Sequence, residues 1–158
     1  MRKLLKSFYD YLLMPELGFR TILRGQDKLY RFLTKKDDIK IGLNGIPYPT
    51  FSVFMPDEKR GTTLSVFRLE LSKSLNFKYY AASCVNSDKI LGYACITYKH
   101  VLSHNLFGVR TEPPKNHVDI VHWPRANEQD LYKAALRAER KLIAQDLSKV
   151  SRLETFGG

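Results

Sequence analysis

Short runs of aromatic and β-branched residues, separated by turn-forming residues, constrain this chain most strongly toward a β-sheet. The runs lie at 29–33, 39–41, 51–54 and 64–69, with Asn44-Gly45, Pro47-Tyr48-Pro49 and the segment 57–61 between them. Such side chains fit a pleated strand, whereas Gly, Pro, Asn and Asp favour turns. The pattern therefore predicts an antiparallel sheet or meander between Lys28 and Leu71.

Further strands are expected nearer the carboxyl end. The segments 93–98 and 106–111 are rich in strand-forming residues, and 117–121 alternates apolar and polar positions. The stretch between the first two is ambiguous. Pro113-Pro114 separates the last two, as expected for residues that cannot continue a strand.

Apolar residues at helical spacing predict helices at three places. The first is the amino-terminal segment, where Pro15 separates two helical stretches. The second is a middle helix over 77–87 that follows Asn76, and the third is a long final helix that begins at Asn127. The predicted fold class is α+β: a mainly antiparallel sheet with amino-terminal helices, a middle helix and a long carboxy-terminal helix.

The 158-residue length suits one domain. We expect an amino-terminal helical segment at 1–25, a sheet-rich core with one helix at 28–126, and the carboxy-terminal helix at 127–152. No apolar stretch approaches the roughly 20 residues of a membrane-spanning helix. Cys84 and Cys95 lack metal or redox spacing, so free thiols in the reducing cytoplasm are expected.

A strong excess of positive charge indicates a polyanionic partner. The chain has 26 Lys and Arg against 16 Asp and Glu, a net charge of +10. The predicted phosphate-contacting surface is the cationic side of the final helix: Lys133, Arg137, Arg140, Lys141 and Lys149. Composition favours nucleic acid, RNA above all, as for a bacterial defence or toxin-type component. An accessory subunit that binds an acidic protein partner is the alternative.

Histidine placement gives the candidate catalytic residues. All 4 histidines lie between His100 and His122. On a strand His117 and Asp119 project to the same side, where a carboxylate can orient an imidazole for proton transfer. The i, i+4 spacing of His100 and His104 would suit a metal on a helix, but no further metal motif accompanies it, and neither metal nor cofactor is predicted.

Two arginines interrupt apolar strands. Arg31 and Arg68 either recognise a phosphate or occupy the solvent-facing side of half-buried strands. If the chain is an enzyme, Arg68 is the expected anion anchor beside His117 and Asp119. Tyr30-Arg31 near the start of a sheet also resembles the first strand of ADP-ribosyltransferases, although their Ser-Thr-Ser and catalytic Glu pattern is missing. That activity is a weaker alternative, and the sequence leaves open whether the protein is an enzyme.

Three motifs together resemble a family of small uncharacterised bacterial proteins. They are Phe54-Met55-Pro56, Ser65-Val66-Phe67-Arg68, and His117-Val118-Asp119-Ile120 followed by Trp123-Pro124. The shared pattern, FMP…SVFR…HxxI..WP before a final helix, covers roughly the last two thirds of the chain. His117, Trp123 and Arg68 match it, whereas His122 replaces a small residue. The resemblance implies no established activity.

Overall fold

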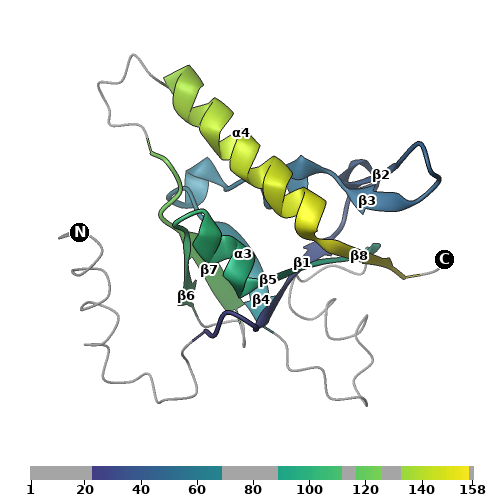
Figure 1. Cartoon of the computed structure of the whole chain (residues 1–158), viewed down its shortest axis with the longest axis horizontal. Helices are drawn as coiled ribbons and strands as arrows, with labels where there is room; N and C mark the ends of the chain where they lie inside the picture. Colours follow the sequence, from purple (N-terminus) through teal and green to yellow (C-terminus); the bar gives the residue numbers. More distant parts are fainter. Residues whose placement is uncertain (1–22, 69–88, 112–116, 126–132, 157–158) are drawn as a thin grey trace.

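A six-stranded sheet forms the centre of the molecule (Figure 1). The computed structural model describes residues 23–68, 89–111, 117–125 and 133–156. The strands lie in the order β6-β7-β4-β1-β5-β8, and every neighbouring pair is antiparallel. Their bounds are β1 Lys28–Leu33, β4 Leu64–Arg68, β5 Gly92–Thr97, β6 Phe107–Arg110, β7 His117–Val121 and β8 Arg152–Thr155. The predicted mainly antiparallel sheet is confirmed.

A two-stranded hairpin and three short 3-10 helices occupy the connection between β1 and β4. The hairpin pairs β2 (Ile39–Ile41) with β3 (Pro47–Pro49) and belongs to a separate sheet. The 3-10 helices are η2 Lys36–Asp38, η3 Phe51–Phe54 and η4 Glu58–Arg60. The prediction of a strand at 51–54 is wrong, because the turn of η3 buries the adjacent Val53 and Phe54 together, whereas a strand would send them to opposite faces.

The helical part of the predicted fold class needs correction. Among the described residues there are two α-helices, α3 (Tyr98–Ser103) and the long α4 (Lys133–Val150). Neither is one of the predicted amino-terminal helices or the predicted middle helix. Those predictions fall on residues 1–22 and 69–88, which lie outside the described residues. The described fold is therefore a mainly antiparallel sheet with one short helix and one long carboxy-terminal helix.

Two element boundaries also differ from the sequence prediction. The strand expected over 93–98 ends at Thr97, because Tyr98 and Val101 bury one side of a helical turn, α3. The final helix, expected to reach 152, ends at Val150. Arg152–Thr155 instead pairs with β5 as strand β8, where its backbone satisfies the open edge of that strand.

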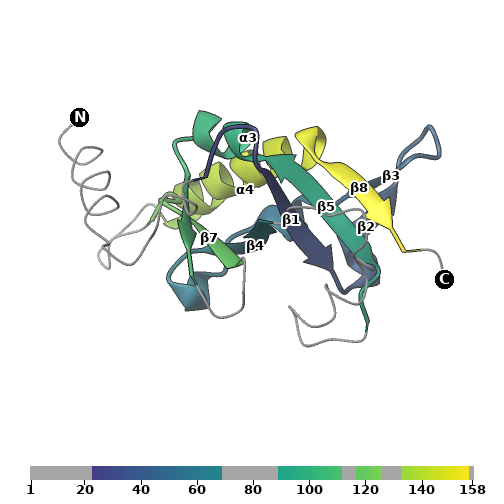
Figure 2. The same cartoon turned by 90° about the horizontal axis from the view of Figure 1, so that it is seen from below.

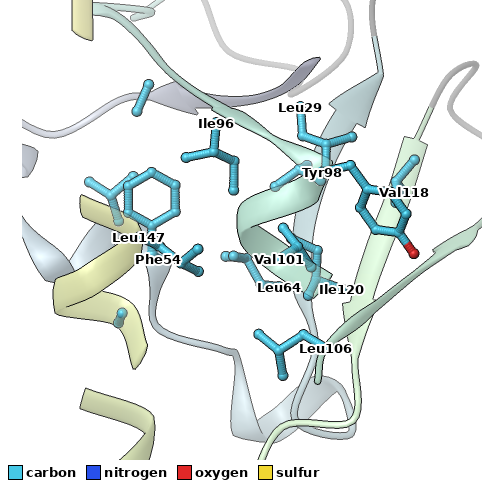
Figure 3. Packing of buried hydrophobic residues seen from close by; sticks show 14 of the residues in the cluster. Leu29, Phe54, Leu64, Ile96, Tyr98, Val101, Leu106, Val118, Ile120 and Leu147 are labelled. Atoms are coloured by element: carbon cyan, nitrogen blue, oxygen red, sulfur yellow. The ribbon is translucent and has the colours of Figure 1, made fainter. Parts of the chain in front are cut away.

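The main hydrophobic core lies between the sheet and the two helices, which occupy the same face of the sheet (Figure 2). Figure 3 shows sheet residues such as Leu29, Ile96 and Ile120 converging on Val101 of α3 and Leu147 of α4. A second cluster occupies the opposite face and contains Tyr30, Phe32, Phe67, Ile90 and Tyr93. Both faces of the sheet are therefore apolar at its centre.

Arg31 lies where the sheet separates. Among the described residues, β1 and β4 pair at Leu29 with Arg68 and at Tyr30 with Phe67, and the ladder does not continue to Arg31 and Val66. Beyond that point Arg31 Nη1 donates to Ser65 O at 2.7 Å and replaces a ladder hydrogen bond. The predicted solvent-facing position of Arg31 is wrong: by alternation the residue shares the helix-covered face with Leu29, and desolvation lowers the pKa of its guanidinium.

Candidate functional site

The predicted catalytic pair, His117 and Asp119, lies on β7 on the face of the sheet away from α4. The His117 side chain is 13% exposed, and its ring meets the ring of Phe67 edge to face with centroids 5.3 Å apart. The backbone register places Asp119 opposite Ser65 of β4. Strand alternation therefore brings the imidazole and the carboxylate to one side of the sheet.

Hydroxyl groups connect the two residues. The Thr111 hydroxyl donates to Asp119 Oδ2 at 3.1 Å, and the Ser65 hydroxyl donates to Asp119 Oδ1 at 3.0 Å. His117 Nδ1 lies 2.6 Å from Thr111 Oγ1 and 3.1 Å from Thr111 O. Because the single Thr111 hydroxyl proton points to Asp119, and because a carbonyl only accepts, Nδ1 is the donor in both contacts.

This network assigns the tautomer of His117. With its proton on Nδ1, the neutral ring presents Nε2 as the acceptor nitrogen. Nε2 lies 3.8 Å from Asp119 Oδ1, which is too long for a hydrogen bond. Asp119 therefore orients the imidazole through Thr111, and Nε2 is the atom that would accept a proton in any general-base step.

Arg68, the predicted anion anchor, does not join this network. Strand β4 neighbours β7, but Arg68 follows Phe67 and projects to the opposite face of the sheet. There its Nε lies 3.3 Å from Asp27 Oδ2. The structure thus brings together two of the three predicted catalytic residues and separates the third from them.

The other histidines are dispersed. His100 Nδ1 contacts Thr97 Oγ1 at 2.9 Å, His104 follows the last residue of α3, and the His122 ring packs on Phe107. Across the part of the chain that the structure describes, no group of three or more His, Cys, Asp or Glu side chains is placed to hold a metal ion.

A strongly basic pocket of about 510 Å³ lies beside the first half of α4. Three of its lining residues, Lys133, Arg137 and Arg140, come from α4, and Arg125 adds a fourth cation. Among the lining residues that the structure describes, Glu58 is the one carboxylate, and Ala134 and Thr62 are the remaining two. Four cations against one carboxylate make this pocket suited to anions.

Two arginines hold the walls of the pocket in place. Arg140, 6% exposed, donates from Nε to Pro124 O at 2.5 Å and from Nη1 to Glu58 Oε1 at 2.6 Å. Arg125 Nη2 donates to Gly61 O at 2.5 Å, in a turn where Gly61 has a φ of +75°. The 57–63 turn is thereby fixed against α4, and the pocket is formed before any ligand arrives.

The five cations predicted to contact phosphates have different environments. Lys133 and Arg137 are exposed in the pocket, with no hydrogen bond or ion pair to another described residue, whereas Arg140 is buried in its wall. Lys141 Nζ lies 5.1 Å from the centre of the Phe51 ring, and Lys149 pairs with Asp146 at 3.2 Å. The predicted cationic face is therefore a pocket at one end of α4, not a continuous stripe.

Sequence reasoning missed four residues of these sites: Thr111, Ser65, Arg125 and Glu58. Ser65 lies two residues before Phe67 on a strand, so the two side chains share one face of the sheet. This alternation places the Ser65 hydroxyl beside Asp119. Arg125 directly follows the Trp123-Pro124 pair. Glu58 carries no local signal, because only a long-range contact brings it to Arg140, whereas Thr111 reaches His117 and Asp119 through the pairing of the neighbouring strands β6 and β7.

Burial perturbs a group of ionisable side chains on the far strands. Desolvation, with a contribution from Cys95, raises the pKa of Tyr30 to about 12. Desolvation and a hydrogen bond to Glu154 raise the pKa of Tyr93, and desolvation raises that of Cys95. These shifts keep all three groups protonated at neutral pH, so none acts as an anionic nucleophile there.

Comparisons with known proteins supply no relative: no family model, curated protein or solved structure matches the chain significantly. The resemblance to the bacterial family accordingly stays a prediction. Among the described residues, no helix combines the length and the apolar character that crossing a bilayer requires.

Proposed function

We propose that this protein binds single-stranded nucleic acid, RNA by preference, through the basic pocket beside α4. The supporting observation is the lining of that pocket, whose described residues include four cationic side chains and a single carboxylate. Phosphate is the most abundant polyanionic group that a protein with a net charge of +10 meets.

The cations of the pocket differ in their freedom to bind. Arg125 and Arg140 already donate to backbone carbonyls, so they present oriented guanidinium groups. Lys133 and Arg137 have no described partner and are free to contact phosphate oxygens. Anion binding here requires little rearrangement, which lowers the entropic cost of association.

The carboxylate favours RNA over DNA. Glu58 accepts from Arg140 through Oε1, and its side chain is 63% exposed. A carboxylate oxygen at the edge of a phosphate-binding pocket can accept from a ribose 2′-hydroxyl, a donor that DNA lacks. We therefore expect tighter binding of RNA than of DNA with the same sequence, and expect Glu58→Gln to narrow the difference.

Fluorescence anisotropy with a labelled single-stranded RNA, measured across several salt concentrations, tests the proposal. The double variant Lys133→Ala with Arg137→Ala should bind the RNA at least about tenfold more weakly. The slope of the logarithm of the association constant against the logarithm of the salt concentration should become shallower by about 1.4, because each phosphate contact on a single strand contributes about 0.7. The matched control, Lys36→Ala with Lys149→Ala, removes the same charge away from the pocket.

Each outcome decides the proposal. Loss of affinity confined to the pocket variant supports it. Equal losses in both double variants would assign the binding to net charge alone. Absence of RNA and DNA binding by the unmodified protein at about 50 mM salt would overturn the proposal in favour of an acidic protein partner.

A further inference from the structure

The β2–β3 hairpin exposes more apolar surface than any other described segment. Its four large apolar side chains are Ile41, 75% exposed, Leu43, fully exposed, Ile46, 61%, and Tyr48, 45%. The hairpin projects from the body beyond the carboxyl end of α4 (Figures 1 and 2). A concentration of exposed apolar side chains on so short a segment marks an interaction surface.

We propose that the tip of this hairpin inserts into the surface of an anionic lipid bilayer. The apolar side chains point in several directions, because Ile41 and Pro47 share one face, Tyr48 lies on the other, and Leu43 and Ile46 flank the turn. A protein groove covers one face of a hairpin, whereas acyl chains surround an inserted tip on all sides.

Three backbone donors at the tip are already hydrogen-bonded. Gly42 N donates to Ile46 O and Gly45 N to Gly42 O, both at 2.9 Å, and Ile46 N donates to Asn44 Oδ1 at 3.1 Å. Donors that are already bonded lower the cost of leaving water. Gly45, with a φ of +75°, supplies the left-handed conformation that this tight turn needs.

Polar groups at the base of the hairpin match the headgroup layer. Lys40 pairs in register with Tyr48, so a cation and a phenol lie at the same height behind the tip. Tyrosine prefers the membrane interface, and lysine is attracted to anionic headgroups. The net charge of +10 adds attraction to an anionic surface.

A second copy of the chain is a poorer occupant. Strands β2 and β3 have three residues each, whereas a stable interface uses roughly 20 to 30 residues a side. Two chains that each carry +10 also repel one another.

The base of the hairpin is anchored to the body. Ser148 Oγ of α4 donates to Pro49 O at 2.5 Å, and Thr50 N donates to Asp38 O at 2.8 Å. The hairpin therefore lies by the last turns of α4, whereas the basic pocket lies beside its first half. Insertion of the tip leaves the pocket open.

Flotation of the full chain with vesicles tests the inference. Vesicles of phosphatidylcholine with one quarter phosphatidylglycerol should carry the protein upward, and part of the binding should survive salt that screens charge. Leu43→Asp with Ile46→Asp should lower partitioning by about 100-fold, because burying each side chain contributes about tenfold or more. The matched control is Leu142→Asp with Leu102→Asp, which adds the same two negative charges at exposed leucines of α4 and α3.

Retained flotation of the control variant, Leu142→Asp with Leu102→Asp, together with the loss of flotation in the hairpin variant supports insertion. Failure of the unmodified protein to float with these vesicles, or equal flotation of the hairpin variant, overturns it. A dimer in light scattering that the hairpin substitutions dissociate would instead assign the surface to a second copy. RNA binding by the hairpin variant should be unchanged, so this test is independent of the pocket.

Discussion

The two halves of α4 are held in the molecule by different interactions. Of the first seven residues, 133–139, six are exposed and only Leu136 is partly buried. In the second half, Ala144 and Leu147 are completely buried against the sheet. Hydrophobic packing thus fixes the carboxyl half of α4, and the polar contacts of Arg140 fix its middle. Because neither kind of contact involves Lys133 or Arg137, these two side chains are available to a ligand.

The largest effect on stability is expected from the core-facing half. Leu147→Ala removes a fully buried side chain and should lower the free energy of unfolding by about 2–5 kcal/mol, through lost burial and the cavity left behind. Urea denaturation measures the loss. Leu142→Ala, at an exposed position of the same helix, should change stability by less than about 0.5 kcal/mol. Comparable losses of stability in Leu147→Ala and Leu142→Ala would mean that hydrophobic packing does not distinguish these two positions of α4.

An intermediate effect is expected at Arg140. Arg140→Met keeps much of the buried volume but leaves the Pro124 carbonyl without its donor, which should cost about 1–3 kcal/mol in the same assay. Glu58→Gln tests the ion pair separately. Because Glu58 is mostly exposed, this change should cost less than about 1 kcal/mol. A larger loss from Glu58→Gln than from Arg140→Met would show that the ion pair, and not the carbonyl contact, holds the helix.

The smallest effect is expected where α4 changes character. Lys141→Ala removes a cation from the face of the Phe51 ring and should cost about 0.5–1 kcal/mol. Lys133→Ala, which has no described partner, should leave stability within about 0.5 kcal/mol of the unmodified protein. Thermal unfolding at low and high salt compares the two. If Lys133→Ala lowers stability as much as Lys141→Ala does, then the first half of α4 does make stabilising contacts.

Most strands of the main sheet were predictable because alternation and turn residues are local signals, whereas Pro47–Pro49, predicted as a turn, forms strand β3. β1, β2, β4 and β7 fall where periodicity placed them. The prediction failed where tertiary contacts decide: 51–54 is a 3-10 helix because Val53 and Phe54 are buried together, and 152–155 is a strand because β5 offers it an edge. The propensity of a short segment depends on its own residues and so cannot predict either of these tertiary contacts.

In the candidate sites, too, local patterns were predictable from the sequence, whereas tertiary contacts were not. A shared strand face was enough to place His117 beside Asp119, but face alternation on β4 turns Arg68 away from them. The charge of the final helix was evident from sequence. The pocket was not, because it needs Glu58, which is distant from α4 in the chain, and Arg125, which lies outside the helix. The motif residues of the family resemblance include Phe54 and Trp123, both buried, so part of that pattern reflects core packing.

Among the described residues, the ladder between β1 and β4 stops at Tyr30 and Phe67, although both strands continue past that point. β1 stays paired with β5 at the same height, where Arg31 lies opposite Ala94. Because no backbone pairing joins Arg31 to Val66, amide hydrogens beside these two residues should exchange with solvent sooner than those between β1 and β5. Arg31 bridges the unpaired part of the two strands through its hydrogen bond to Ser65 O. When the strands separate, the positive charge of its guanidinium draws water toward the interior. The sheet should therefore unfold locally at its centre, between Arg31 and Val66, before the pairing of β1 with β5 opens.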